Sequence, residues 1–120
     1  MCILRNLEYT IVQEDKNLYI LNTVNTYLEE NYTKEISLDE ISSVCHLSKY
    51  YFSHLFKNLT GISFVGYLSA YRLEKAILLL KNSKASVTDI AFNCGFGNVR
   101  SFNRMFKRQF KTTPLKFRKT

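Results

Sequence analysis

The stretch that decides the fold is Ile90-Ala91-Phe92-Asn93-Cys94-Gly95-Phe96-Gly97-Asn98-Val99-Arg100-Ser101-Phe102-Asn103-Arg104-Met105-Phe106-Lys107. Its pattern predicts a helix, a turn and a second, basic helix. Gly95 supplies the positive φ that ends the first helix, and Asn98 offers a side-chain oxygen to the free N–H groups of the second. Phe102 and Phe106 lie one helical turn apart and are expected to face a core. The stretch therefore predicts a helix-turn-helix.

The opposite face of the second helix carries polar groups, because residues three and four apart are neighbours on a helix. Val99, Arg100, Asn103 and Arg104 share this face. Two arginines and an asparagine on one exposed face suit base edges and phosphates. Taken alone, however, the face is better interpreted as an ordinary solvated helix surface.

A second copy of the pattern lies about fifty residues upstream, in residues 41–57. Ile41, Ser42, Cys45 and Leu47 lie 49 positions before Ile90, Ala91, Cys94 and Phe96, and Phe52, Phe56 and Lys57 lie 50 positions before Phe102, Phe106 and Lys107. Each copy opens with a helix start signal, Ser37-Leu38-Asp39-Glu40 or Ser86-Val87-Thr88-Asp89. In both, the serine oxygen caps an N–H and the acid favours the positive helix end. Two diverged helix-turn-helix units are therefore predicted.

With these residues the chain resembles the DNA-binding domain of the AraC/XylS transcriptional regulators, from about Lys16 to Arg118. The resemblance is carried by Ile90-Ala91, Gly95-Phe96, Phe102, Arg104, Phe106-Lys107, Thr113-Pro114 and Phe117-Arg118, with Arg72-Leu73-Glu74-Lys75-Ala76 and Leu79-Leu80 between the repeats. Three residues depart from the family pattern. Ser42 replaces the usual alanine, while His46 and Lys111 stand where glycine is common. Histidine tolerates left-handed geometry, whereas Lys111 leaves the turn after the last recognition helix open.

The resemblance implies that both recognition helices enter adjacent major-groove segments on one face of double-stranded DNA. Family members regulate transcription, more often by activation than by repression, and RNA polymerase is the implied partner. The family usually adds an N-terminal effector-binding or dimerisation domain, which these 120 residues do not contain. Two interpretations stay open: a small standalone regulator, or the C-terminal part of a longer sensor.

Mapping the family motif onto this chain predicts the contact residues. The bases are expected to be read by Tyr50, Ser53 and His54 from the first recognition helix and by Val99, Arg100, Asn103 and Arg104 from the second. Arginine suits guanine, Asn103 suits adenine and Val99 suits a thymine methyl. The phosphates are expected to contact Ser48, Lys49, Lys57, Asn98, Lys107 and Arg108. The alternatives are that Tyr50 or Tyr51 belongs partly to the core, that Lys57 and Lys107 are solvated charges, and that His54 touches only backbone.

The charge distribution agrees with a polyanionic partner. The net charge is +7, yet residues 1–40 carry three basic and eight acidic side chains, residues 41–83 five and one, and residues 84–120 nine and one. A basic field of this kind attracts phosphate polymers or anionic lipid surfaces. The alternative function is therefore a basic helical module that binds a protein partner or an anionic membrane surface without reading bases.

Other classes find little support in the sequence. No apolar run is long enough for a membrane span or a signal peptide. Cys2, Cys45 and Cys94 lack Cys-x-x-Cys spacing, which indicates a reducing, cytoplasmic setting. Cys45 and Cys94 are expected to be small buried residues beside the turns; a redox sensor, or a zinc site formed with His46 and His54, is less favoured. No catalytic motif is present, so neither enzyme activity nor a cofactor is expected.

The expected architecture is all-α, with two helix-turn-helix subdomains joined by a long shared helix. Leu18, Leu21, Val24 and Leu28 predict a first amphipathic helix from about Lys16 to Asn31. The helix from Ser63 to about Lys81 is apolar on two sides, which predicts that its start packs on the first unit and its end on the second. We expect residues 1–15 to be an irregular segment or linker remnant, 16–62 the first subdomain, 63–82 the linker helix and 83–120 the second subdomain, closed by a short helix that starts at Thr113-Pro114.

Overall fold

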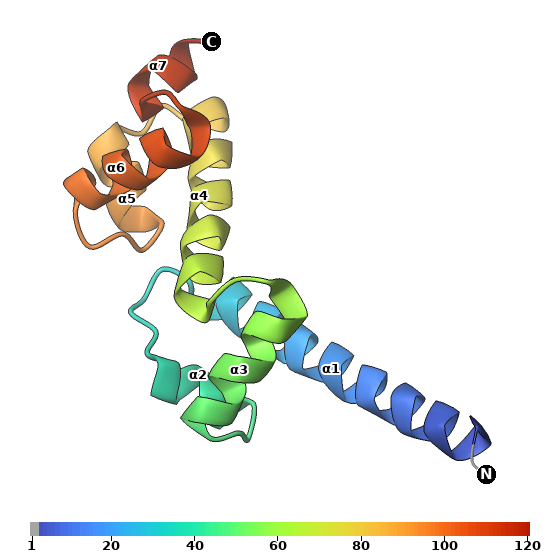
Figure 1. The fold of residues 1–120 in the computed structure, drawn as a ribbon. Helices are drawn as coiled ribbons and strands as arrows, with labels where there is room; N and C mark the ends of the chain where they lie inside the picture. Colours follow the sequence, from blue (N-terminus) through green and yellow to red (C-terminus); the bar gives the residue numbers. More distant parts are fainter. Residues whose placement is uncertain (1–2) are drawn as a thin grey trace. The chain divides into compact units, whose positions relative to one another are not determined.

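The computed structural model describes residues 3–120, with side chains from Gln13 onward. This part of the chain consists of helices and contains no strand (Figure 1). The helices are α1 Ile3–Asn31, α2 Leu38–Val44, α3 Lys49–Thr60, α4 Phe64–Asn82, α5 Val87–Asn93, α6 Val99–Phe110 and α7 Pro114–Lys119. The prediction of an all-α fold is confirmed. No helix among the described residues is both long and apolar enough to cross a membrane.

The chain divides into two compact units. The first unit comprises the chain up to Glu30 together with Ile36–Phe64, and the second comprises Asn31–Glu35 and Val65–Thr120. Each unit therefore holds one helix-turn-helix, α2–α3 in the first and α5–α6 in the second. The short segment Asn31–Glu35, which precedes α2 in sequence, belongs to the second unit.

Helix α1 begins much earlier than expected. The prediction of an irregular segment over residues 1–15 is wrong for residues 3–15, which are helical; residues 1–2 lie outside the described part. Residues 3–15 contain neither glycine nor proline, the residues that disfavour a helix most strongly. In the sequence, Leu4, Leu7 and Ile11 also recur at three- and four-residue steps, which is helical spacing.

The buried stripe of α1 differs slightly from the expected one. Ile20, Val24 and Leu28 are buried, whereas Leu18 is 57% exposed. Ile20, Val24 and Leu28 are spaced four residues apart, so they form one row on the helix surface. The predicted stripe was correct at Val24 and Leu28 but rotated at its N-terminal end, where either of two apolar rows fits the sequence.

Each unit is centred on a pair of phenylalanines from its second helix. Phe52 and Phe56 on α3, and Phe102 and Phe106 on α6, have no exposed surface. In the first unit the ring of Phe64 lies 5.9 Å from Phe52 and 5.8 Å from Phe56, between ring centroids. Burial of each such side chain contributes about 1.5–3 kcal/mol, so these pairs anchor the two helices.

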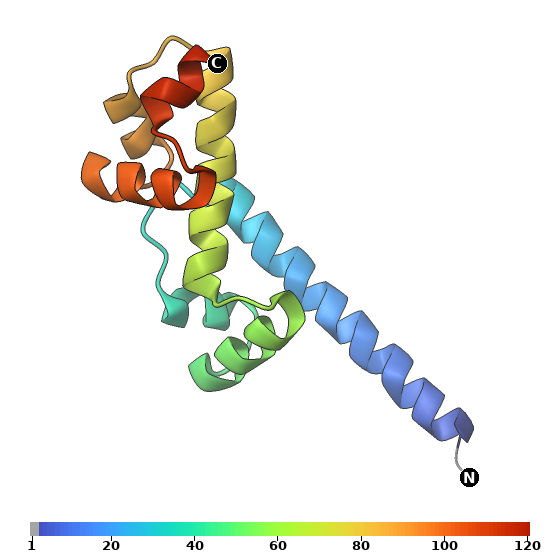
Figure 2. The same ribbon diagram turned by 45° about the horizontal axis from the view of Figure 1, so that its top comes forward.

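The core of the second unit joins four helices. It contains Leu73, Ala76 and Leu80 of α4 with Ile90, Ala91, Cys94, Phe96, Phe102 and Phe106, and Phe117 of α7 packs against it. Within this unit, α5, α6 and α7 gather around the C-terminal part of α4 (Figure 2). The rings of Phe106 and Phe117 lie 5.5 Å apart. Most of α4 is thus a core helix of the second unit.

Side-chain caps begin five of the described helices, and the sequence predicted four of them, at Ser37, Ser86, Asn98 and Thr113. The oxygens of Ser37, Ser48, Ser86, Asn98 and Thr113 accept hydrogen bonds from the backbone N–H groups of Glu40, Tyr51, Asp89, Ser101 and Lys116. Pro114 opens α7 at the first turn. A cap of this kind contributes about 0.5–2 kcal/mol, which matters for helices of six or seven residues that cannot form alone.

The helix ends use left-handed residues at equivalent positions of the two repeats. His46 and Gly95 follow α2 and α5 with φ of 59° and 91°. Gly61 and Lys111 follow α3 and α6 with φ of 84° and 61°. Each repeat therefore has one glycine and one non-glycine residue in this conformation, so His46 and Lys111 keep the left-handed geometry at the two positions where the family commonly has glycine.

Candidate nucleic-acid interface

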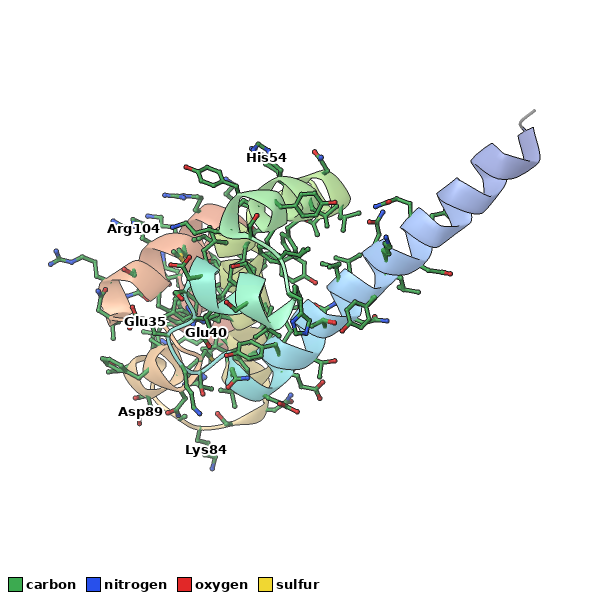
Figure 3. The ribbon with its side chains drawn as sticks, turned by 90° about the horizontal axis from the view of Figure 1, so that it is seen from below. Glu35, Glu40, His54, Lys84, Asp89 and Arg104 are labelled. Atoms are coloured by element: carbon green, nitrogen blue, oxygen red, sulfur yellow. The ribbon has the colours of Figure 1, made fainter. Side chains whose placement is uncertain are left out.

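Helix α6 separates apolar and polar side chains cleanly. Phe102 and Phe106 are buried on one face. The other face exposes Arg100, Asn103, Arg104, Lys107 and Arg108. Arg104 points away from the body of its own unit (Figure 3). This face can offer guanidinium and amide groups to base edges and cationic groups to phosphates.

Val99 lies at the start of α6, and its side chain is less exposed than the sequence suggested. It is half-buried and packs against the core of the second unit. The exposed remainder of its side chain is apolar, which suits contact with a methyl group better than hydrogen bonding. Its neighbour Asn98 caps the helix, because its Oδ1 accepts a hydrogen bond from the Ser101 N–H at 2.7 Å.

Helix α3 presents a different face. Tyr50 is 81% exposed, which argues against a core role for this residue. His54 is exposed and points outward from α3 (Figure 3), while Ser53 is half-buried. The exposed groups are thus a phenol, an imidazole and part of a hydroxyl, with less positive charge than on α6.

The predicted phosphate residues occupy the helix ends. Ser48 caps α3 by accepting a hydrogen bond from Tyr51 N–H at 3.2 Å. Lys49 lies 3.8 Å from the Asp39 carboxylate in an exposed pair, and such pairs contribute little, so the lysine can exchange this partner for a phosphate. Lys57 and Lys107 hold equivalent positions in the last turns of α3 and α6, and with Arg108 they are exposed.

Two arginines bind backbone carbonyls, a role that the sequence did not indicate. Arg72 on α4 donates to the carbonyl oxygens of Tyr32 at 2.9 Å and Lys34 at 2.7 Å. Arg118 on α7 donates to those of Leu80 at 3.0 Å and Ser83 at 3.1 Å, at the end of α4. Both belong to the motifs quoted for the family resemblance, yet partners more than thirty residues away leave no local pattern in the sequence.

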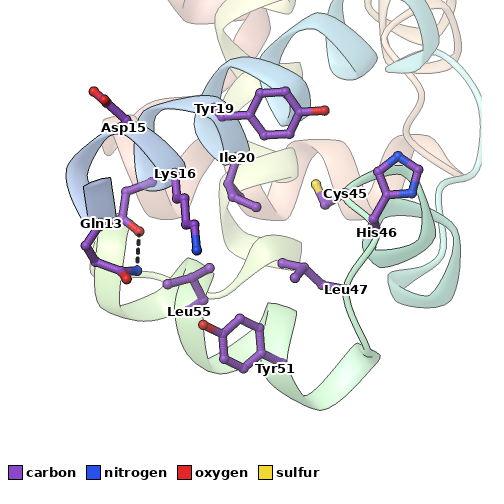
Figure 4. A pocket seen from close by; sticks show the side chains of 11 residues that line it. Gln13, Asp15, Lys16, Tyr19, Ile20, Cys45, His46, Leu47, Tyr51 and Leu55 are labelled. Atoms are coloured by element: carbon purple, nitrogen blue, oxygen red, sulfur yellow. Dashed lines mark hydrogen bonds between the residues drawn. The ribbon is translucent and has the colours of Figure 1, made fainter. Parts of the chain in front are cut away.

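A groove of about 560 Å³ lies in the first unit between α1 and the α2–α3 turn (Figure 4). Ile20, Cys45 and Leu47 form part of its wall, and His46 stands at its edge. Burial raises the pKa of the Cys45 thiol, as it does for Cys94 in the second unit. Both thiols are buried beside the turns, as predicted, and a raised pKa makes a poor nucleophile at neutral pH.

Nearby, the Tyr27 hydroxyl donates a hydrogen bond to the Glu40 carboxylate, which ties α1 to α2 and raises the pKa of Tyr27. Across residues 3–120 no group of three or more His, Cys, Asp or Glu side chains is arranged to hold a metal ion. What the two units have in common is a solvent-facing polar face on the second helix of each helix-turn-helix, α3 in the first unit and α6 in the second.

Comparison with known proteins identifies this framework. Residues 41–120 match the model of a helix-turn-helix domain family. The chain is 34% identical over 100 residues to the transposon Tn10 TetD protein of Escherichia coli, covering 83% of this chain and 72% of TetD. It is 39% identical over 98 residues to the transcriptional activator RhaS of Klebsiella pneumoniae, covering 82% of this chain but 35% of RhaS. The chain thus spans about a third of the length of RhaS.

Solved structures share the fold. The DNA-binding domain of AdpA, a global transcriptional factor, crystallised with a target DNA, matches with a TM-score of 0.77 at 26% identity, covering 82% of this chain and 88% of that one. A regulator with an AraC-type DNA-binding domain from Chromobacterium violaceum matches with a TM-score of 0.79 at 27% identity, covering 84% and 90%. The chain belongs to the AraC-type helix-turn-helix family.

Proposed function

We propose that this chain binds double-stranded DNA with sequence specificity and regulates transcription. The carrying observation is the face of α6, where Arg100, Asn103 and Arg104 are exposed opposite the buried Phe102 and Phe106. An α-helix fits the major groove, and arginine and asparagine are the side chains that read guanine and adenine there. The AdpA domain, which has this fold, was crystallised with its target DNA.

The second unit supplies the richer reading surface. Arg100 or Arg104 reads guanine by donating two hydrogen bonds to O6 and N7, and Asn103 reads adenine at N6 and N7. Val99 contacts a thymine methyl group with the part of its side chain that the core leaves free. From the first unit, Tyr50, Ser53 and His54 read an adjacent segment of the major groove, and the exposure of Tyr50 supports this role.

Phosphate contacts fix the register of both helices. The groups assigned to this role are Ser48, Lys49, Lys57, Asn98, Lys107 and Arg108. Lys49, Lys57, Lys107 and Arg108 neutralise phosphates by charge. Ser48 and Asn98 mark helix starts, where the first backbone N–H groups lack partners within the helix and favour anions.

The regulatory outcome follows from relatives. RhaS proteins are named transcriptional activators, and activation in the cytoplasm with RNA polymerase as partner is therefore the proposed outcome for this chain. RhaS is much longer than the matched segment. The proposal therefore includes an effector-binding or dimerisation domain that acts together with this unit.

Selection of binding sites from random duplex DNA tests the proposal. The expected result is an enriched sequence with two distinct, non-palindromic subsites, because the two reading faces carry different side chains. Competition with vesicles of anionic lipid provides the control. Absence of enrichment, together with equal displacement by vesicles and duplex, would establish instead a basic module that does not read bases.

A further inference from the structure

The segment Asn31–Glu35, here named the connector, packs with the second unit although it begins at the last residue of α1 and precedes α2 in sequence. The ring of Tyr32 lies 5.6 Å from that of Tyr71, measured between centroids. Lys75 Nζ lies 5.8 Å from the Tyr32 centroid and 5.2 Å from that of Tyr71. Aromatic packing and cation–π attraction thus hold the connector side chain against α4.

Arg72 holds the backbone of the connector. Its Nε donates to the Tyr32 carbonyl at 2.9 Å and its Nη2 to the Lys34 carbonyl at 2.7 Å. Burial lowers the pKa of Arg72, but a guanidinium stays charged in proteins. A planar fork can bind two carbonyls at once, which an ammonium group on a flexible stem does less well.

The same Tyr32 carbonyl lies against the turn between α5 and α6. A Cβ on Gly95 would stand 2.4 Å from the Tyr32 oxygen and 2.7 Å from Arg72 Nε. Real Cβ atoms do not approach other atoms so closely. Glycine is therefore required at position 95 for two reasons, the φ of 91° and this close approach.

The turn is fixed on its other side by the core. Phe96 is buried, and its ring lies 5.0 Å from that of Phe102 on α6. The Gly95 and Phe96 N–H groups close the turn by donating to the carbonyls of Phe92 and Ala91, both at 3.0 Å. The connector and the core thus hold the turn from two sides, three residues before α6 begins at Val99.

The first unit differs at the matching position. His46, the counterpart of Gly95, is left-handed with φ 59° but carries an exposed side chain at the edge of a groove (Figure 4). A side chain is therefore accommodated in the first turn and excluded from the second. At Gly95 the side chain is excluded by the Tyr32 carbonyl of the connector and by Arg72.

We infer that Arg72 and the connector position the N-terminal end of α6 for base reading, so that Arg72 is a positioning residue of the second unit. The inference rests on the proposed function and extends it to residues 31–35, which lie outside the matched family segment 41–120. Loss of the Arg72 hydrogen bonds frees the Tyr32 carbonyl, loosens the turn and lets Arg100, Asn103 and Arg104 reach the bases in several arrangements rather than one.

The experiment compares Arg72→Gln with Arg118→Gln in the full 120-residue chain. Arg118 is the matched control, because its guanidinium also binds backbone carbonyls, those of Leu79, Leu80 and Ser83, and carries the same charge but holds the end of α4. Amide hydrogen exchange of Gly95–Arg100 is measured in the free protein. Arg72→Gln is expected to raise this exchange at least about tenfold more than Arg118→Gln does.

Binding is then measured on the selected site and on duplexes altered in one subsite at a time. Arg72→Gln is expected to lose about tenfold in discrimination at the α6 subsite, with discrimination at the α3 subsite kept within about twofold; tenfold corresponds to about 1.4 kcal/mol. Arg72→Lys, which retains the charge and one donor group, should fall between wild type and Arg72→Gln, and it replaces Arg72→Gln if that variant does not fold.

Equal losses at both subsites, or equal effects of Arg72→Gln and Arg118→Gln, would overturn the inference and leave Arg72 a purely structural residue. Unchanged turn exchange in Arg72→Gln would overturn it as well. A wild-type chain without any sequence preference would contradict the proposed function instead, and the exchange measurement would still decide whether the connector holds the turn.

Discussion

Arg100, Asn103 and Arg104 carry the reading role at the level of single residues, because they are exposed on the face of α6 opposite its buried phenylalanines. Arg100→Ala or Arg104→Ala is expected to cost about 1–3 kcal/mol on the preferred site and to relax the choice at one or two base pairs. Lys107→Ala should weaken all duplexes alike, since a phosphate contact carries no sequence information. Titration of each variant on preferred and random duplex makes the distinction. Equal losses on both duplexes for both arginines would show that neither reads a base.

Substitution of Gly95 and of Gly61 distinguishes the cost of backbone strain from the cost of steric exclusion. Both have positive φ, but a Cβ at Gly61 meets nothing within 4 Å, whereas at Gly95 it meets backbone. Gly61→Ala is expected to cost about 0.8 kcal/mol of unfolding free energy, because the strain of about 1–2 kcal/mol is partly offset by about 0.4–1 kcal/mol from the lower freedom of alanine in the unfolded chain. Gly95→Ala should cost about 2–4 kcal/mol, because overpacking is added to the strain. Denaturant unfolding of the two variants measures the difference. Equal costs would mean that the connector moves away from the added Cβ at no cost in free energy.

At the scale of single helices, Lys111 ends α6 in a left-handed conformation with φ 61°. Lys111→Gly removes a strain of about 1–2 kcal/mol from the folded chain. The greater freedom of glycine in the unfolded chain offsets about 0.4–1 kcal/mol of this gain. A net stabilisation of about 0.8 kcal/mol, the difference between the midpoints of these two ranges, is expected. Lys111→Ala, which removes the same charge but keeps a Cβ, is the control and should not stabilise. A more stable Lys111→Ala would point to charge repulsion instead.

The helices that the sequence predicted best are those with side-chain caps. Ser37, Ser86 and Asn98 act within three residues of the groups they cap, so their patterns are local and can be read directly. The periodic phenylalanines of α3 and α6 likewise predicted which faces are buried. Residues 3–15 were missed because a loose alternation near Tyr9–Val12 resembles a strand, while the helical steps become clear only over a longer window.

The residues around the second turn were predicted only in part. The positive φ of Gly95 follows from its place after a helix, but its contact with the Tyr32 carbonyl does not. That contact depends on Arg72, which reaches 40 residues back along the chain. Hydrogen bonds from a side chain to distant carbonyls depend on the packed fold, so neither spacing nor composition indicates them.

For the molecule as a whole, the uneven charge predicts strong salt dependence. Residues 84–120 carry nine basic and one acidic side chain, and Lys49, Lys57, Lys107 and Arg108 are the proposed cationic phosphate contacts. The slope of log affinity against log salt should be about −3 to −4, at 0.9 per neutralised phosphate. Lys57→Ala should reduce its magnitude by about 1. A slope near zero would contradict phosphate binding altogether.

Sequence-specific binding is the central claim, and the most direct test is one titration of the 120-residue chain at about 0.15 M salt. The duplex obtained by selection is compared with a scrambled duplex of the same length and base composition. We expect at least about 10³-fold tighter binding to the selected duplex, with most of that ratio lost in an Arg100→Ala/Arg104→Ala double variant that unfolds at the same denaturant midpoint as the wild type. Equal affinity of the wild-type chain for the two duplexes would contradict it.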